Sequence, residues 1–374
     1  MPDISMDTAR ALRVPGRAGI ELISPTEVMR QVRKSNILLD SLYAIPPLLL
    51  NLGLYGRKDT CIYVGFKGNV MPVVLRRTLG FYALSQHSPP QLEDRRSGTA
   101  RIDTEENIRV LRAAYPAMLV KLRQHPFDDP YLQSCPGSIG EPRTAEFDLR
   151  LDVGSPIRNL YQSLSKDHRN RIRRALALRD DEVVSLTSES LPPCVRDETN
   201  VDGLRRFGQL LAHTLGKIHM RADQREAPGF IQSYTKDYAL LEKVFPTIRD
   251  YGLVKIFTAY DREGNPASGA VLLVSNTYVS SPMALWWLGG STAEGNKQGV
   301  SVTLQWSMIA WLARNGYLRY YMGGIWPEGM RRGPTNFKKG FGGDVVVGHS
   351  LQYSPLPLVA DFLGRDGAFY RLRN

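Results

Sequence analysis

The residues that most clearly suggest chemistry lie where an apolar strand, a polar turn, a helix and a second strand follow one another between residues 282 and 324. The apolar stretch ends at Gly289-Gly290, and the polar turn over residues 291–299 leads into a predicted helix over 300–314. Backbone amides at such a turn, together with the helix dipole, can hold a phosphate group.

Several familiar kinds of site are missing from the sequence. There is no Gly-x-Ser-x-Gly segment and no cysteine paired with a nearby histidine, so no covalent acyl-enzyme is expected. The glycines before Lys297 do not complete a P-loop, because no serine or threonine follows that lysine, and no Gly-x-Gly-x-x-Gly segment occurs. His213 and His219 are not spaced to share one helix face, so we expect no metal site.

The order of strand, turn, helix and strand resembles the central unit of the N-acyltransferase fold. Acyl-CoA enzymes of that fold commonly carry Gln or Arg, two residues, Gly, one residue, and then Gly or Ala. The matching run here extends from Asn296 to Ser301; it keeps Gly299 and lacks both end residues. Ser301 puts a side chain where the backbone would approach a pyrophosphate, which disfavours CoA as the donor and leaves it as an alternative.

A strongly basic segment precedes this region. Residues 156–178 (PIRNLYQSLSKDHRNRIRRALAL) place apolar residues at helical spacing and fill most other positions with positive charge, which predicts one basic helix. Such a helix can present cations to the phosphates of a nucleic acid. The candidate contacts with tRNA are Arg169, Arg171, Arg173 and Arg174. The alternative is a solvated helix face, and the alanines at 175 and 177 also suit helix packing.

Composition indicates a globular chain of two domains. The 374 residues exceed one ordinary core, and 48 Lys and Arg against 37 Asp and Glu give a net charge of +11. That charge favours an anionic partner. The most apolar stretch, residues 44–54, is short and contains two prolines, so no stable membrane insertion is expected. Three dispersed cysteines fit neither a disulfide framework nor a metal site, and a cytoplasmic location is expected.

Two segments almost two hundred residues apart follow the same pattern. Residues 61–75 predict a hairpin around Lys67-Gly68-Asn69, and residues 253–274 predict a second hairpin around a turn over 261–266. The repetition suggests two related α/β domains. Further helices are predicted over 104–124, in spite of a proline at 116, and over 201–220, and a strand is predicted over 317–322.

Several motifs together resemble the C-terminal domain of the Fem family of bacterial aminoacyltransferases. They are WWLGGS (286–291), ARNGY (313–317), YYMGGI (320–325) and NFKKGFGG (336–343), while SLSKDHRNRIRRAL (163–176) is similar to the segment that links the family's two domains. The resemblance implies an α/β fold of two GNAT-like (acyl-CoA N-acyltransferase) domains, with mixed central sheets flanked by helices. We place them at residues 1–160 and 161–374, with the acyl-transfer site in the second and the C-terminal end packing back on the first.

The resemblance also implies site residues. In the Fem family a Phe-Lys pair lies at the acyl-transfer site, where the lysine is thought to stabilise the developing oxyanion. By position this pair is Phe337 and Lys338, with Lys339 as the competitor, because neighbouring residues on a strand point to opposite faces. Tyr321 stands where many relatives have Asp. The residues expected to bind substrate are Lys339, Tyr321, Gly323, Gly324, Trp326, Arg331 and Arg332.

The implied function is that of an aminoacyltransferase that forms an amide. It would move an aminoacyl group from aminoacyl-tRNA to an amine of a peptidoglycan precursor or of a small peptide-like metabolite. No cofactor is expected, since aminoacyl-tRNA is itself the donor, and the protein is expected to be a monomer. Two alternatives stay open: an acyl-CoA-dependent N-acyltransferase, and a non-catalytic module that binds tRNA or another RNA.

Overall fold

The computed structural model describes two compact units, each presented here by itself. The described residues are 143–221, 227–250, 252–274, 282–325 and 332–354, with the shorter segments 12–13, 20–23, 59–66, 69–78, 81–86, 91–92, 104–114 and 119–124. One unit comprises Met1–Phe147 with Val346–Asn374, and the other comprises Asp148–Val345. From the sequence, the boundary was expected after residue 160. About the last 25 residues are expected to pack on the first domain, and of these residues 355–374 lie outside the described residues.

The first unit is built on a largely antiparallel sheet. Its strands are β1 (Leu12–Arg13), β2 (Ile20–Ile23), β3 (Asp59–Phe66), β4 (Asn69–Thr78), β5 (Phe81–Gln86), β6 (Gln91–Leu92), β7 (Leu119–Gln124) and the later part of β14 (Asp344–Tyr353). Strands β1 to β5 pair in sequence order, β5 pairs in parallel with β7, and β7 pairs with β14. The predicted hairpin around residues 67–69 is the β3–β4 pair.

One helix prediction in the first unit is wrong. Residues 104–124 do not form a single helix, because α3 (Thr104–Ala114) ends before Pro116 and Leu119–Gln124 is strand β7. A proline has no N–H to donate, and it drives the preceding residue away from the helical region. The apolar side chains of Leu119, Val120 and Leu122 are buried in the strand.

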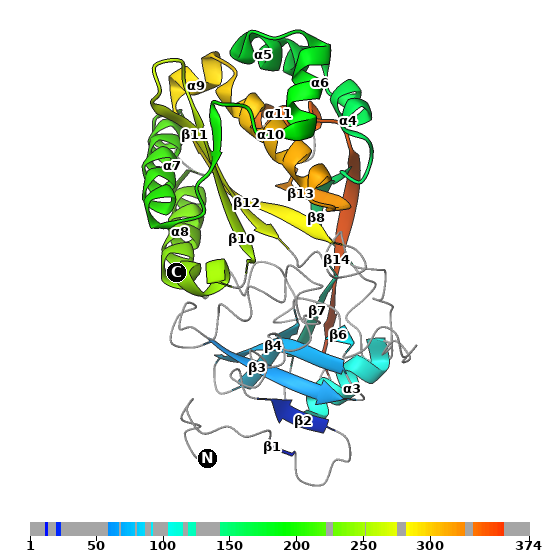
Figure 1. The fold of residues 1–374 in the computed structure, drawn as a ribbon. Helices are drawn as coiled ribbons and strands as arrows, with labels where there is room; N and C mark the ends of the chain where they lie inside the picture. Colours follow the sequence, from blue (N-terminus) through cyan, green and yellow to red (C-terminus); the bar gives the residue numbers. More distant parts are fainter. Residues whose placement is uncertain are drawn as a thin grey trace. The chain divides into compact units, whose positions relative to one another are not determined.

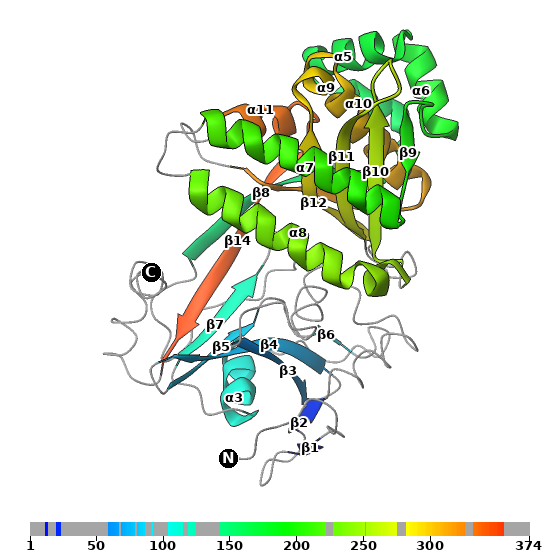
Figure 2. The same ribbon diagram turned by 90° about the vertical axis from the view of Figure 1, so that its left-hand side faces the viewer.

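The second unit has a mixed sheet. Its strands follow the order β8 (Arg143–Asp152), β13 (Arg319–Gly324), β12 (Met283–Ser291), β11 (Pro266–Val274), β10 (Val254–Tyr260) and β9 (Val195–Asp197). Only the part of β8 from Asp148 onward belongs to this unit. The β12–β13 pair is parallel and the other pairs are antiparallel. The predicted hairpin over 253–274 is the β10–β11 pair. The long helices α7 (Val201–Arg221) and α8 (Ala227–Asp250) cover one face of the sheet, as Figure 2 shows from the side.

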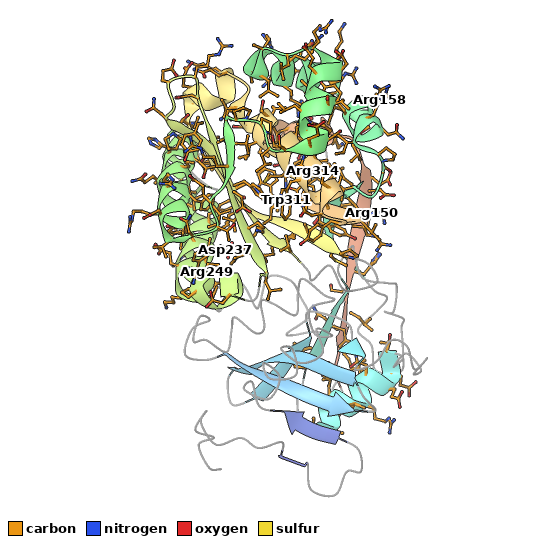
Figure 3. All side chains as sticks on the ribbon, in the orientation of Figure 1. Arg150, Arg158, Asp237, Arg249, Trp311 and Arg314 are labelled. Carbon is orange, nitrogen blue, oxygen red and sulfur yellow. The ribbon has the colours of Figure 1, made fainter. Side chains whose placement is uncertain are left out.

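Helix α10 (Val300–Arg314) covers the opposite face of this sheet, and α5 (Lys166–Leu176) and α6 (Asp180–Glu189) pack on it from outside (Figure 1). Most side chains of α10 are buried, and they point to all sides of the helix, which is typical of a core helix. Arg314 lies at the end of α10 (Figure 3). Its guanidinium donates hydrogen bonds to the carbonyl oxygens of Thr187 and Ser190 at the end of α6. The predicted helix over 300–314 is confirmed.

The basic segment over 156–178 is two helices, not the one helix predicted. Helix α4 (Ile157–Ser163) ends before Ser165, whose hydroxyl accepts a hydrogen bond from the backbone N–H of His168 and so begins α5. Serine is a preferred residue at this position, because its side chain satisfies a free N–H of the first turn. The basic residues from Lys166 to Arg174 therefore belong to α5 and are separated from α4.

The segment after β13 also differs from the prediction. Residues 332–339 form helix α11 (Arg332–Lys339), where a loop followed by a strand-like Phe-Lys pair was expected. Pro334 is compatible with this helix because it lies in the first turn, where no N–H is needed. Neighbouring residues on a helix differ by about 100°, so Lys338 and Lys339 do not face opposite sides of a strand. None of the helices in the described ranges combines the length and the apolar character that a membrane span requires.

Candidate acyl-transfer site

The site lies where two parallel strands separate. Strands β12 and β13 pair only over Met283 to Leu285, although β12 continues to Ser291 and β13 continues to Gly324. Just beyond the last pair, Trp287 is an extra residue on β12, since Leu272 pairs with Trp286 and the preceding Val271 pairs with Leu288. Such bulges occur often next to active sites, where they redirect side chains. The separation leaves a gap in the sheet of the second unit.

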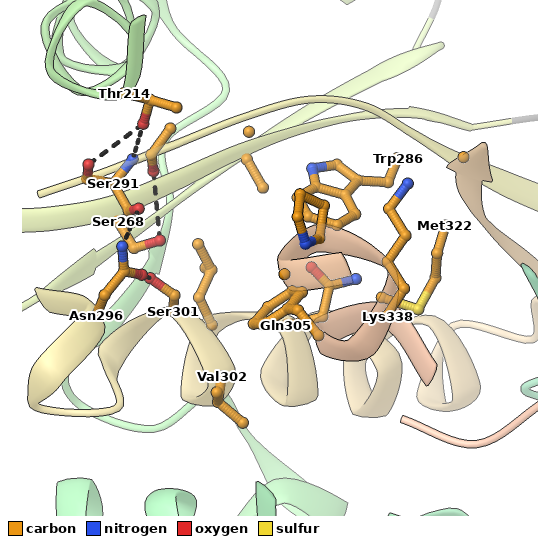
Figure 4. Close-up of a pocket in the computed structure, with 18 of the residues that line it drawn as sticks. Thr214, Ser268, Trp286, Ser291, Asn296, Ser301, Val302, Gln305, Met322 and Lys338 are labelled. Atoms are coloured by element: carbon orange, nitrogen blue, oxygen red, sulfur yellow. Dashed lines mark hydrogen bonds between the residues drawn. The ribbon is translucent and has the colours of Figure 1, made fainter. Parts of the chain in front are cut away.

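A cavity of about 680 Å³ occupies this gap. Its walls come from β11, β12, α9 (Ala293–Lys297), the first half of α10, the end of β13 and helix α11, together with residues of α5, α7 and α8. Figure 4 shows Trp286, Met322 and Lys338 at one end, the polar residues Ser291, Asn296 and Ser301 at the other, and Gln305 between the two ends. The volume falls within the range usual for small-molecule sites.

Lys338 supplies the cation at one end of the cavity. Its Nζ donates a hydrogen bond of 2.8 Å to the carbonyl oxygen of Gly324 and lies 5.6 Å from the ring centroid of Trp286. Burial lowers the pKa of the Lys338 ammonium to about 8, while the carboxylate of Asp148 acts in the opposite direction. A lysine with this pKa is mostly charged at neutral pH and can donate hydrogen bonds into the cavity.

The helix that carries Lys338 is held against α5. The backbone N–H of Ser165 donates to the carbonyl oxygen of Gly340 at 2.8 Å, and the imidazole Nε2 of His168 lies 3.0 Å from the carbonyl oxygen of Phe337. The ring of His168 packs edge-on against Phe341, with 4.5 Å between centroids. Burial lowers the pKa of His168, so its imidazole is neutral and Nε2 donates to the carbonyl. The motifs over 163–176 and 336–343 are thus in direct contact.

The opposite end of the cavity is polar and largely uncharged. The hydroxyl of Ser301 donates to the amide oxygen of Asn296 at 2.6 Å, and the amide nitrogen of Asn296 donates to the hydroxyl of Ser291 at 2.9 Å. The hydroxyl of Thr214 accepts a hydrogen bond from the backbone N–H of Ser291. Gly299 adopts a φ of 81° at the start of α10, and a Cβ there would lie 3.0 Å from the carbonyl oxygen of Arg171.

Comparison with known proteins agrees with this geometry. Residues 162–339 match the family model described as an acetyltransferase (GNAT) domain. This region is a GNAT-fold domain. The expected fold class, α/β with GNAT-like mixed sheets and flanking helices, is therefore confirmed. No curated protein matches the chain in sequence.

Three solved structures share the fold of nearly the whole chain. FemX has a TM-score of 0.58 at 12% identity, over 88% of this chain and 97% of its own. The C-terminal domain of an Agrobacterium fabrum protein described as a lysylphosphatidylglycerol synthetase has a TM-score of 0.52 at 15% identity, over 91% and 95%. L-PGS from Bacillus licheniformis has a TM-score of 0.51 at 15% identity, over 91% and 96%. At these identities the likeness concerns the fold alone.

The GNAT domain brings together only part of the predicted catalytic and substrate-binding residues. Phe337, Lys338, Gly323 and Gly324 line the cavity, whereas Lys339 is exposed and is not part of the lining. Tyr321 is fully buried on the other face of β13, where burial raises its pKa to about 12 and the guanidiniums of Arg319 and Arg150 act against that rise. Two further predictions, Trp326 and Arg331, lie outside the described residues, as does the side chain of Arg332.

The four arginines proposed for tRNA have partners within the GNAT domain. The guanidinium of Arg169 donates to the carbonyl oxygens of Gln162 and Leu164, at 2.8 and 2.7 Å. Arg171 forms an ion pair with Asp167 at 2.8 Å and lines the cavity. The remaining contacts are those of Arg173 with Asn170 and Asp180, and of Arg174 with the carbonyl oxygen of Asn170. Arg174 is the one of the four that is exposed.

Several residues of the cavity were not predicted from the sequence. Trp286 and Trp287 are part of a motif quoted above, but only the bulge in β12 brings both to the cavity wall. Gln305 is buried in α10, and its amide donates to the hydroxyl of Tyr320 on β13. A polar residue in the middle of a mostly apolar helix was the available signal. His168 lies in the basic segment, and no local pattern indicates its role because its partner Phe337 is 169 positions away.

Proposed function

We propose that this protein is an aminoacyltransferase that moves an aminoacyl group from aminoacyl-tRNA to an amine of a peptidoglycan precursor or of a small peptide-like metabolite. The observation that carries the proposal is the position of Lys338. Its ammonium lies at the separation of β12 and β13 within a GNAT domain, held by the carbonyl of Gly324 beside the ring of Trp286.

The chemistry needs few groups from the protein. The acceptor amine attacks the carbonyl carbon of the aminoacyl ester, a carbon–nitrogen bond forms, and the bond to the ribose oxygen breaks when the tetrahedral intermediate collapses. The amine loses one proton and the departing ribose hydroxyl gains one. Negative charge develops on the carbonyl oxygen in between, and a fixed donor there contributes about 2.7–4 kcal/mol in comparable acyl transfers. Lys338 is the donor that we assign to this oxyanion.

Two features of the turn before α10 support tRNA over CoA as the donor. The carbonyl oxygen of Arg171 packs against Gly299, so a partial negative charge lies beside the turn that would hold a pyrophosphate. The hydrogen bond between Ser301 and Asn296 occupies the side of the turn that faces the cavity. The net charge of +11 favours a polyanionic donor such as tRNA.

One structural relative supports testing an aminoacyl group as the moiety transferred. The name lysylphosphatidylglycerol synthetase describes a product that carries a lysyl group. Because the identity is only 15%, this comparison supports the choice of substrates to test and does not identify them.

The test mixes the purified protein with a panel of amines and either aminoacyl-tRNA or acyl-CoA. We expect deacylated tRNA to be released only when both the protein and an amine are present. We expect no release of free thiol from acyl-CoA. Thiol release without tRNA turnover would instead establish the CoA-dependent reaction. Retention of charged tRNA on the protein without turnover of either donor would indicate a binding module.

A further inference from the structure

The end of the cavity away from Lys338 contains a chain of three polar side chains. Ser301, Asn296 and Ser291 are joined in that order by two hydrogen bonds of 2.6 and 2.9 Å, and all three line the cavity (Figure 4). They come from the start of α10, from α9 (Ala293–Lys297) and from the end of β12. We call this set the serine–asparagine chain.

The serine–asparagine chain has a fixed hydrogen-bonding polarity at its ends. The amide of Asn296 accepts a hydrogen bond from Ser301 and donates one to Ser291. The serine that has donated can only accept from a ligand, and the other serine keeps a proton to donate. A ligand that fits must itself both donate and accept, on one side of the molecule.

The charges near the serine–asparagine chain are already paired. The guanidinium of Arg171 at the cavity edge forms an ion pair with Asp167 at 2.8 Å. The ammonium of Lys217 donates to the backbone carbonyl oxygen of Ser291 at 3.0 Å and is not part of the cavity lining. The pyrophosphate of CoA is an ionised diester that offers only acceptors, and it would meet the acceptor end of the chain and the carbonyl oxygen of Arg171.

An extended peptide supplies the matching groups. The N–H and the C=O of one residue in an extended strand point to the same side, which is how paired antiparallel residues exchange two hydrogen bonds. Such a residue donates to one serine and accepts from the other. Asn296 and Ser301 are also the two positions at which the sequence departs from the acyl-CoA motif.

We propose that Ser291, Asn296 and Ser301 form a subsite that recognises the N–H and C=O of one residue of an extended peptide substrate. The proposal rests on the proposed function, because it makes the substrate a peptide-like molecule with its reacting group toward Lys338. The subsite would select substrates with an uncharged peptide backbone at a set distance from the reacting group. In acyl-CoA enzymes of this fold, a pyrophosphate would occupy the same position.

The test uses three probes, of which two differ only in one group of atoms. Acetyl-alanine methylamide has the N–H and C=O of one residue, and acetyl-lactate methylamide has an ester oxygen in place of that N–H. Binding of each to the full chain is measured by ligand-detected NMR, in both stereochemical series and without any donor. Pyrophosphate is the third probe. Loss of one matched hydrogen bond weakens binding by about fivefold or more.

We expect the wild-type protein to prefer the amide over the ester and to bind pyrophosphate more weakly than either. Ser301→Ala should remove the preference for the amide, and Asn296→Arg with Ser301→Gly should make pyrophosphate the tightest of the three probes. Lys297→Ala is the control, because that side chain is exposed next to Asn296 and does not line the cavity. It should behave as wild type.

The proposal is wrong if the wild-type protein does not distinguish amide from ester, if it binds neither, if it prefers pyrophosphate, or if Ser301→Ala keeps the preference. Because binding is measured without donor or turnover, these outcomes are independent of the transfer assays. A protein that failed every transfer assay could still bind the amide selectively, and one that transferred an aminoacyl group could still fail this test.

Discussion

The imidazole Nε2 of His168 lies 3.0 Å from the carbonyl oxygen of Phe337, the residue before Lys338. This contact joins α5 to the end of α11, across 169 positions of the sequence. His168 is buried, and its other ring nitrogen lies 3.9 Å from the carboxylate of Asp167, beyond hydrogen-bonding distance. The ring therefore fixes the backbone that carries Lys338, and His168 acts as a positioning residue for the lysine.

Two substitutions of His168 distinguish the stability that comes from its hydrogen bond from the pH dependence that comes from its imidazole. His168→Gln keeps an N–H donor for the Phe337 carbonyl, whereas His168→Leu leaves that carbonyl without it, at a cost of about 1–3 kcal/mol in the free energy of unfolding. Burial lowers the pKa of His168 in the folded protein, so as pH falls the unfolded chain binds a proton at this imidazole at a higher pH than the folded protein does. Wild-type stability should therefore fall as pH decreases below about 6.5, with a steeper fall than in His168→Gln. Thermal unfolding at several pH values measures this, and parallel curves would contradict it.

Gly340 should tolerate no side chain while His168 is present. A Cβ at this residue would lie 2.4 Å from Cε1 of the imidazole, and the buried ring also packs against Phe341. Gly340→Ala is expected to destabilise the protein by about 1–3 kcal/mol, as overpacking does. His168→Ala should relieve much of that loss, which a double-mutant cycle by chemical denaturation would measure. Additive effects of the two substitutions would mean that the ring and the glycine are not coupled.

The parts of the fold that can be predicted from the sequence are those with strong local signals. Helix α10 follows from an apolar run that ends at Asn315-Gly316, and the β10–β11 hairpin follows from two apolar strands around a polar turn. The prediction of one helix over 104–124 fails because Pro116 outweighs the apolar spacing. Helix α8 was not predicted, since its pattern is weak and Pro246 lies within it.

The candidate site depends on contacts that no local pattern contains. The motif resemblance indicates Lys338, but its bond to Gly324 requires α11 to form and turn back on β13, 14 residues earlier. The glycine of the KKGF motif is explained by the ring of His168, which approaches it from another helix. The cavity itself exists because β12 and β13 separate, and strand separation leaves no mark in either strand's sequence.

Lys338→Met should lower turnover by about a hundredfold or more, the usual effect of removing one oxyanion donor. Methionine keeps most of the side-chain length, and water can replace the lost donor because Gly324 is exposed, so the melting temperature should change little. Lys339→Met is the matched control, because that lysine is exposed outside the cavity lining, and it should behave nearly as wild type. Equal turnover of Lys338→Met and wild type would remove the assigned role.

The arginines of α5 should divide into structural and tRNA-contacting residues. Arg169→Met leaves the carbonyls of Gln162 and Leu164 without their donor, so we expect a loss of about 1–3 kcal/mol in stability. Exposed Arg174→Met should leave stability unchanged, weaken tRNA binding, and reduce the slope of log affinity against log salt by about 1. Unchanged tRNA affinity and salt slope in Arg174→Met would exclude this face as the tRNA contact.

The pH dependence of turnover tests the charge state of Lys338. Its pKa is about 8, lowered by burial, so the ammonium that stabilises the oxyanion is present below pH 8 and is lost as pH rises through 8. The acceptor amine must be deprotonated to attack, which adds a rising limb whose position is set by the pKa of that amine. We expect a bell-shaped profile of kcat/KM in the wild-type protein and, because arginine stays charged, no falling limb near pH 8 in Lys338→Arg at reduced overall turnover. If the falling limb is the same in Lys338→Arg as in wild type, it does not report the Lys338 ammonium, and the oxyanion role assigned to that ammonium is wrong.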